Sequence, residues 1–89
     1  MRAVITVIGK DRKGIIAEVS AELAKSGINI LDISQTTLQE YFAMIMLVDL
    51  SDANDTFHSV RKKMEEKGQQ IGMDIRIQRE DIFNAMHEV

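Results

Sequence analysis

The chain contains no cysteine, no proline and no tryptophan. The absence of cysteine excludes a disulfide framework and a thiolate metal site, and it is typical of a protein that works in a reducing compartment. Long apolar runs are also missing, because AVITVI at residues 3–8 is too short for a signal-peptide core or a bilayer span. We therefore expect a cytoplasmic protein that does not enter a membrane.

Aromatic residues and an excess of basic charge are also scarce. Only 4% of the residues are aromatic, and the adjacent Tyr41 and Phe42 would point to opposite faces of a strand, so they make no platform for stacking RNA bases. Fourteen acidic residues against eleven basic ones give a net charge of −3. The short cluster at residues 61–63 is followed at once by two glutamates, which is typical of a solvated helix face. We expect no nucleic-acid partner.

The residue types that carry catalysis or bind metals are isolated from one another. His58 and His87 have no second ligand at metal-binding spacing, and no serine lies in a nucleophile-elbow context. The aspartates at 49, 52 and 55 precede a predicted helix, where capping explains them. The sequence therefore predicts a protein that is not an enzyme and that holds neither a metal nor a cofactor.

Periodicity divides the 89 residues into one domain, 1–89, of strands and helices. A strand at 3–8 is followed by a helix that starts near Gly14, has Ile16, Val19 and Leu23 at helical spacing, and closes at Ser26-Gly27. Strands follow at 28–38 and 41–50, joined by a hairpin at Gln39-Glu40. A second helix with Phe57, Val60 and Met64 inward should end at Gly68. A strand at 72–79 and a short helix or tail at 81–89, with Ile82, Phe83 and Met86 as its apolar side, complete the chain.

This βαββαβ order predicts an α+β, ferredoxin-like fold, in which a four-stranded antiparallel sheet carries two helices on one face. The first and third strands are apolar on both faces and should be central. The uncovered face would then display Val4 or Ile5 and Met44 or Ile45. Met44 and Met46 suit a contact surface, although methionine is also an ordinary core residue. We expect a homodimer or higher homo-oligomer, paired through a sheet edge or a sheet face.

The stretch GKDRKGII, residues 9–16, joins the first strand to the first helix. Free amides and the positive end of the dipole at a helix start suit a small carboxylate, and the Asp11 carboxylate suits an ammonium group. The alternative is a charged turn in which Asp11 bonds nearby backbone amides. Two enzymes or carriers of similar topology fit poorly: a copper chaperone needs paired cysteines in this loop, and an acylphosphatase needs an asparagine to accompany Arg12.

The chain resembles the ACT domains, small regulatory modules that bind amino acids, over essentially its whole length. The resemblance rests on Asp11-Arg12-Lys13-Gly14, which is similar to the family's Asp/Asn-Arg-Pro-Gly turn, and on Gly27-Ile28-Asn29-Ile30 after the helix. It resembles in particular free-standing, single-ACT bacterial proteins related to the repeats of the glycine cleavage system's transcriptional repressor. Lys13 replaces the family's proline, which loosens the turn and brings a charge to it.

The resemblance implies a ligand site at a boundary between two copies, which often pair edge to edge. Asp11 would meet the polar groups of a small amino acid or related metabolite, and the amides of Gly14 and Ile15 would meet its carboxylate. Asn29 would come from the neighbouring copy. Arg12, Lys13 and Ile30 complete the expected set. Such a module would regulate an enzyme or a transcription factor. Two alternatives stay open: Asn29 bonds the end of the preceding helix, or the chain is a dimerisation module without a ligand.

Overall fold

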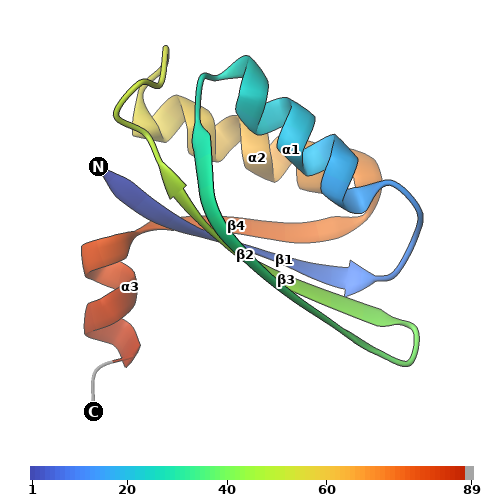
Figure 1. Cartoon of the computed structure of the whole chain (residues 1–89). Coiled ribbons are helices and arrows are strands. Elements are labelled where there is room, and N and C mark those ends of the chain that lie inside the picture. Colours follow the sequence, from blue (N-terminus) through green and yellow to red (C-terminus); the bar gives the residue numbers. More distant parts are fainter. Residues whose placement is uncertain (88–89) are drawn as a thin grey trace.

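The computed structural model describes residues 1–87 and shows the predicted α+β architecture (Figure 1). The strands are β1 (Arg2–Lys10), β2 (Asn29–Leu38), β3 (Tyr41–Asp49) and β4 (Met73–Arg79). The helices are α1 (Ile15–Lys25), α2 (Phe57–Ile71) and α3 (Glu80–His87). The predicted terminal helix therefore forms from residue 80, and residues 88–89 lie outside the described part of the chain.

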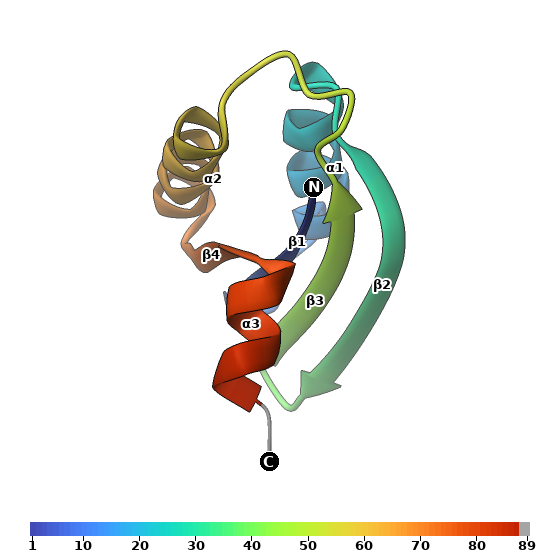
Figure 2. The same ribbon diagram turned by 90° about the vertical axis from the view of Figure 1, so that its left-hand side faces the viewer.

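The sheet has the strand order β2-β3-β1-β4, with every described pair antiparallel. The prediction that the first and third strands are central is confirmed, and β2 and β4 are the edges. α1 and α2 cover one face of the sheet, while α3 lies on the other side (Figures 1 and 2). This arrangement is the ferredoxin-like fold with one helix added.

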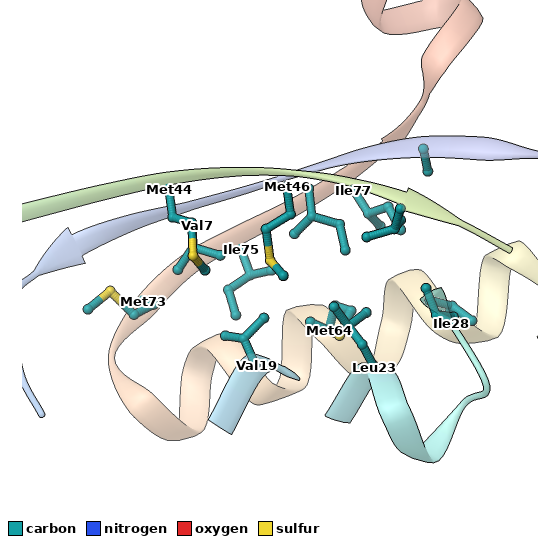
Figure 3. Packing of buried hydrophobic residues seen from close by; sticks show 14 of the residues in the cluster. Val7, Val19, Leu23, Ile28, Met44, Met46, Met64, Met73, Ile75 and Ile77 are labelled. Carbon is teal, nitrogen blue, oxygen red and sulfur yellow. The ribbon is translucent and has the colours of Figure 1, made fainter. Parts of the chain in front are cut away.

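The core lies between the sheet and the pair α1 and α2 (Figure 3). Ile5, Val7 and Met46 of the central strands are fully buried against Leu23 of α1 and Met64 of α2, the last 1% exposed. These side chains share one face because successive strand residues alternate. Met44 also faces the core, so of the two roles considered for Met44 and Met46 the contact surface is wrong and the core role is correct. They fill irregular space inside the domain, which methionine does well.

Three local features of the strands and of α1 differ from the sequence prediction. β1 extends past Gly9, because its pairing with β3 continues to Lys10. In α1 the inward residue of the first turn is Ile15, whereas Ile16 is 37% exposed. In β2 the register shifts between Ile30 and Asp32, so the simple alternation expected over 28–33 is interrupted by a β-bulge.

The second helix does not end at Gly68. It continues to Ile71 and ends at Gly72, whose φ of 73° gives the left-handed cap. Gly68 lies inside the helix. A glycine is needed at this position because a Cβ would meet the carbonyl oxygen of Met73 at 2.6 Å. This glycine therefore permits α2 to lie close to the backbone of β4. The prediction that the helix ends at Gly68 is wrong, because the glycine serves packing and does not terminate the helix.

The face of the sheet opposite α1 and α2, called the open face below, contains Val4, Ile8, Ala43 and Ile45. Residues paired across β1 and β3 point to the same side of the sheet, and the sides alternate along each strand. Val4 and Ile45 therefore lie on the open face, whereas Ile5 and Met44 lie on the face covered by the helices. α3 contacts β1 and β4 on this side. Val4 is only 7% exposed, whereas Ile8 and Ile45 are 53% and 49% exposed. The sheet is thus covered on one face and partly bare on the other.

The hairpin between β2 and β3 forms at the predicted residues, but Gln39 has a φ of 54°. The left-handed region costs a residue with a side chain about 1–2 kcal/mol, and glycine avoids most of this cost. We expect Gln39→Gly to raise the free energy of unfolding by about 0.5–1 kcal/mol in urea titrations. Glu40→Gly is the control, since Glu40 does not have a positive φ; an equal gain there would contradict the explanation.

Asp55 lies at the start of α2, where the sequence predicts capping. Hydrogen bonds from Lys63 Nζ (2.6 Å), the Ser59 hydroxyl (2.7 Å) and the Thr56 amide (2.9 Å) hold the pKa of its carboxyl to about 2. Thr56 is the N-cap residue and accepts from the Ser59 amide. Thr56, rather than one of the three aspartates, is therefore the residue that caps α2. Asp55 bonds side chains of the helix, and Asp49 accepts from Ser51.

The lowered pKa predicts an acid-dependent loss of stability. The folded pKa lies below the ordinary value of 3.8, so ionised Asp55 stabilises the fold above about pH 4 and ceases to do so as pH falls towards about 2. We expect Asp55→Asn to lower the melting temperature at pH 7 and to flatten its decline between pH 4 and pH 2. Melts across this range measure both effects. Asp52→Asn, in the same loop, should keep the wild-type slope.

Candidate functional site

The loop that follows β1 is held against the β2–β3 hairpin. The amide of Asp11 donates to the carbonyl oxygen of Glu40 over 2.7 Å. This backbone bond does not depend on the side chain of residue 11, and it leaves the exposed Asp11 carboxylate available at the loop surface. In the alternative reading, the Asp11 side chain would bond nearby backbone amides. No such side-chain bond is found among the described residues, and the loop is held by the bond to the hairpin instead.

Gly14 turns the chain into α1 with a φ of 86°. A helix N-cap is often Ser, Thr or Asp, whose side chain bonds the first amides. Gly14 has no such side chain, and the first intrahelical bond runs from the Glu18 amide to the Gly14 carbonyl oxygen (2.9 Å). The amides of residues 15–17 precede it, so α1 presents donors and the positive end of its dipole to the outside.

A cavity of about 300 Å³ opens beside this helix start. Gly14 and the first turn of α1 form one side, the edge strand β2 contributes Gln35 and Thr37, and Phe42, only 5% exposed, lies on the apolar side. Pairing with Met44 and Phe42 turns Gln35 and Thr37 to the same face as the helices. The lining residues are Asp11, Arg12, Gly14, Ile15, Ile16, Ala17, Gln35, Thr37 and Phe42.

The cavity combines groups that suit a zwitterion. Amides at a helix start and the amide of Gln35 can donate to a carboxylate, while Asp11 and Thr37 can accept from an ammonium group. Its volume is at the lower end of the range for small-molecule sites, which fits a ligand of amino-acid size. The geometry therefore permits binding of a small polar molecule, and it brings Asp11, Arg12, Gly14 and Ile15 together.

Arg12 is engaged with protein acceptors. Its guanidinium donates to the Ile71 carbonyl oxygen at the end of α2 (3.2 Å) and to Glu18 Oε2 in α1 (2.6 Å). A further bond of 3.2 Å reaches the carbonyl oxygen of Lys13. Arg12 thus ties the loop to both helices, and it lines the cavity while it holds the loop in position.

These contacts predict a stability effect for Arg12. We expect Arg12→Ala to lower the free energy of unfolding by about 1 kcal/mol, since the ion pair to Glu18 is partly exposed while the bond to Ile71 is part-buried. Arg12→Lys should restore little, because an ammonium cannot reproduce the forked geometry. Urea titration measures both. Full stability of the alanine variant would show that these bonds contribute nothing.

The remaining expected residues lie elsewhere. Lys13 is exposed and does not line the cavity. Asn29 and Ile30 begin β2, about 20 Å along the strand from Gln35. The carbonyl oxygen of Lys25 at the end of α1 accepts from Asn54, which fills the structural role considered for Asn29. Within one chain, Asn29 and Ile30 are therefore separated from Asp11.

Sequence reasoning missed Gln35, Thr37 and Phe42. The sequence does contain a signal for two of them: Gln35 and Thr37 are two residues apart near the end of a predicted edge strand, on the same face as Ile33. The bulge at Leu31 makes this face hard to predict from the sequence, because it changes which residues of β2 face the helices.

Other kinds of site are not apparent in residues 1–87. No group of three or more His, Asp or Glu side chains in that range could hold a metal ion. None of the helices described there is both long enough and apolar enough to cross a membrane. The cavity at the start of α1 is thus the candidate site that the loop chemistry singles out.

Comparison with known proteins agrees with the fold. The ACT domain model matches residues 2–78. A UPF0237 protein of Clostridium acetobutylicum is 58% identical over 89 residues, which are 100% of both chains. An ACT domain protein from Streptococcus pneumoniae is similar in structure, with a TM-score of 0.80 and 45% identity over 100% of this chain and 96% of that chain. A structure designated a glycine cleavage system transcriptional repressor is similar with a TM-score of 0.73 and 28% identity, over 86% of this chain and 44% of that chain. The chain belongs to the ACT domain family.

Proposed function

We propose that this protein is a cytoplasmic regulatory module that binds a small amino acid or related metabolite and modulates a partner protein. ACT domains are typically regulatory, ligand-binding modules rather than catalysts. The observation that carries the proposal is the cavity at the start of α1, where the amides of residues 15–17 and the Asp11 carboxylate lie together. The amides suit a carboxylate, and the Asp11 carboxylate suits an ammonium group.

The ligand in this proposal is held mainly by one chain and completed by another. Gly14 and Ile15 offer backbone amides to the carboxylate, and Asp11 accepts from the ammonium group, with Gln35 and Thr37 beside them. Asn29 and Ile30 contribute from a second copy, because about 20 Å of strand separates them from the cavity in their own chain. The module is then a homo-oligomer in which ligand binding requires two assembled copies. The regulated partner is an enzyme or a transcription factor.

Screening the twenty amino acids by thermal shift and titration calorimetry tests the binding step. A ligand at one hundred times its dissociation constant stabilises the folded state by about 2.7 kcal/mol. We expect one or a few small amino acids to do so. If none raises the melting temperature and none gives heat, the proposed ligand class is wrong.

Mixing two inactive variants tests whether the site is shared between copies. Asp11→Ala and Asn29→Ala should each lose binding, but mixed dimers contain one intact site that combines Asp11 of one chain with Asn29 of the other. After subunit exchange, about a quarter of the sites should bind again in calorimetry. Binding by Asn29→Ala alone would instead confine the site to a single chain.

The open face favours a second candidate function. A pure interaction module needs an exposed apolar surface but no ligand, and Ile8 and Ile45 provide such a surface. This candidate predicts the same oligomeric state and no response to any amino acid. The ligand screen therefore separates the two.

A further inference from the structure

We infer that α3 is a dimerisation element: two copies pair through their open faces, with the α3 helix of each copy lying across β2 and β3 of the other. This interface is on the opposite side of the sheet from the cavity at the start of α1. The inference does not depend on ligand binding. It also involves Glu80–His87, which lies outside the residues that match the ACT domain model.

The first observation is that α3 covers only half of the open face. It packs against β1 and β4, where Val4 is 7% exposed and Gln78 Nε2 lies 3.5 Å from Met86 Sδ. An ion pair of 2.8 Å between Arg2 and Glu80 fixes the start of the helix to β1. Ile45 of β3 remains 49% exposed. The half of the face formed by β2 and β3 is therefore the bare half.

The second observation is the composition of that bare half. The central residues of β2 and β3 on this face are uncharged, and the charged side chains of these two strands, Asp32 and Asp49, lie towards one end of it. Depletion of charge in the centre of an apolar surface is typical of the core of a protein interface. The uncharged residues of this strip are Ser34, Thr36, Ala43, Ile45 and Leu47.

The third observation is that α3 itself has apolar side chains that its own chain covers only in part. Ile82 is 49% exposed and Met86 is 63% exposed, although the helix already rests on the sheet. Figure 1 shows α3 descending from the face that α1 and α2 leave bare, so the helix and the open face meet at an angle. Each copy thus presents both a projecting apolar helix and a bare apolar strip.

The dimensions of these two features agree. Eight helical residues span about 12 Å, and two strands span about 10 Å across. A two-fold axis places each helix on the strip of the other copy, so both exposed surfaces are buried at once.

The exposed apolar area is sufficient for a stable pair. The exposed side chains are Ile8, Leu38, Tyr41, Ile45, Ile82 and Met86. At about half exposure they contribute on the order of 500 Å² per chain, and the small residues between them bring this near the ~800 Å² per partner of a standard interface. A patch of this size is at the upper limit for a monomer.

Sedimentation equilibrium without any ligand tests the interface. We expect the mass of the wild-type assembly to fall by half in Ile45→Lys and in Met86→Lys, because a lysine in the centre of the buried strip would be unpaired. Both residues are exposed in the single chain, so circular dichroism should show the fold intact. Ile16→Lys, an exposed isoleucine on α1, is the matched control and should keep the wild-type mass. A monomeric wild type, or unchanged mass in Ile45→Lys, would overturn the inference.

The absence of cysteine allows a second, geometric test. Ile45→Cys and Met86→Cys proteins, prepared separately and then mixed and oxidised, should form a disulfide-linked dimer that joins residue 45 of one chain to residue 86 of the other. A mixture of Ile45→Cys with Ile16→Cys should not. Equal cross-linking in both mixtures would reject the arrangement, whereas failure of the amino-acid screen would leave these results untouched.

Discussion

Asp11→Ala is expected to abolish the stabilisation that the ligand gives to the folded protein. At one hundred times the dissociation constant this removes about 2.7 kcal/mol, or about 10 °C or more in the melting temperature of a domain this small. The reason is the loss of the acceptor for the ammonium group, since the loop remains in place: the bond to Glu40 uses the backbone amide of residue 11. Differential scanning calorimetry with and without the amino acid measures the effect.

Asp52→Ala is the control for this prediction, because it removes an exposed carboxylate far along the chain from the cavity. It should retain the full ligand-induced shift. Asp11→Asn keeps an oxygen acceptor but loses the charge, so its shift should lie between those of the wild type and Asp11→Ala. An undiminished shift in Asp11→Ala would remove Asp11 from the site.

Gly68→Ala is expected to lower the free energy of unfolding by about 2–3 kcal/mol. Alanine at an ordinary helix position would instead stabilise by about 1 kcal/mol relative to glycine. The sign reverses because the new methyl group would approach the Met73 carbonyl oxygen at 2.6 Å and Ile75 Cγ1 at 3.1 Å. The backbone oxygen cannot move aside as a flexible side chain would. Urea unfolding followed by circular dichroism measures the change.

Gly72→Ala separates steric contact from backbone conformation. A Cβ at Gly72 meets nothing within 4 Å, so its cost comes only from the φ of 73° and should be about 1–2 kcal/mol. A stabilising effect of Gly68→Ala would contradict the close approach of α2 to β4.

The order of elements followed from the sequence because the hydrophobic period changes clearly between strands and helices. The doubly apolar runs at β1 and β3 identified the central strands, and the polar end of β2 identified an edge. The errors arose where tertiary contacts override a local rule. Gly68 looked like a helix end because glycine usually breaks helices, yet the approach of β4 selects it.

The candidate site was only partly predictable for a similar reason. The Asp11–Gly14 turn is contiguous, so its chemistry could be read directly. Gln35 and Thr37 reach the same cavity only through the pairing of β2 with β3, and the bulge near Leu31 sets which way they point. Spacing alone also gave no sign that Arg12 bonds the end of α2, because Ile71 is 59 residues away.

The central claim is that the start of α1 binds the ligand, and amide chemical shifts in a ¹⁵N-labelled protein test it most directly. Titration with the amino acid found in the screen should move the amides of Ile15, Ile16 and Ala17 most, with smaller changes at Gln35 and Thr37. These shifts should disappear in Asp11→Ala. Shifts confined to other parts of the sheet, or none at residues 15–17 at saturation, would contradict the account.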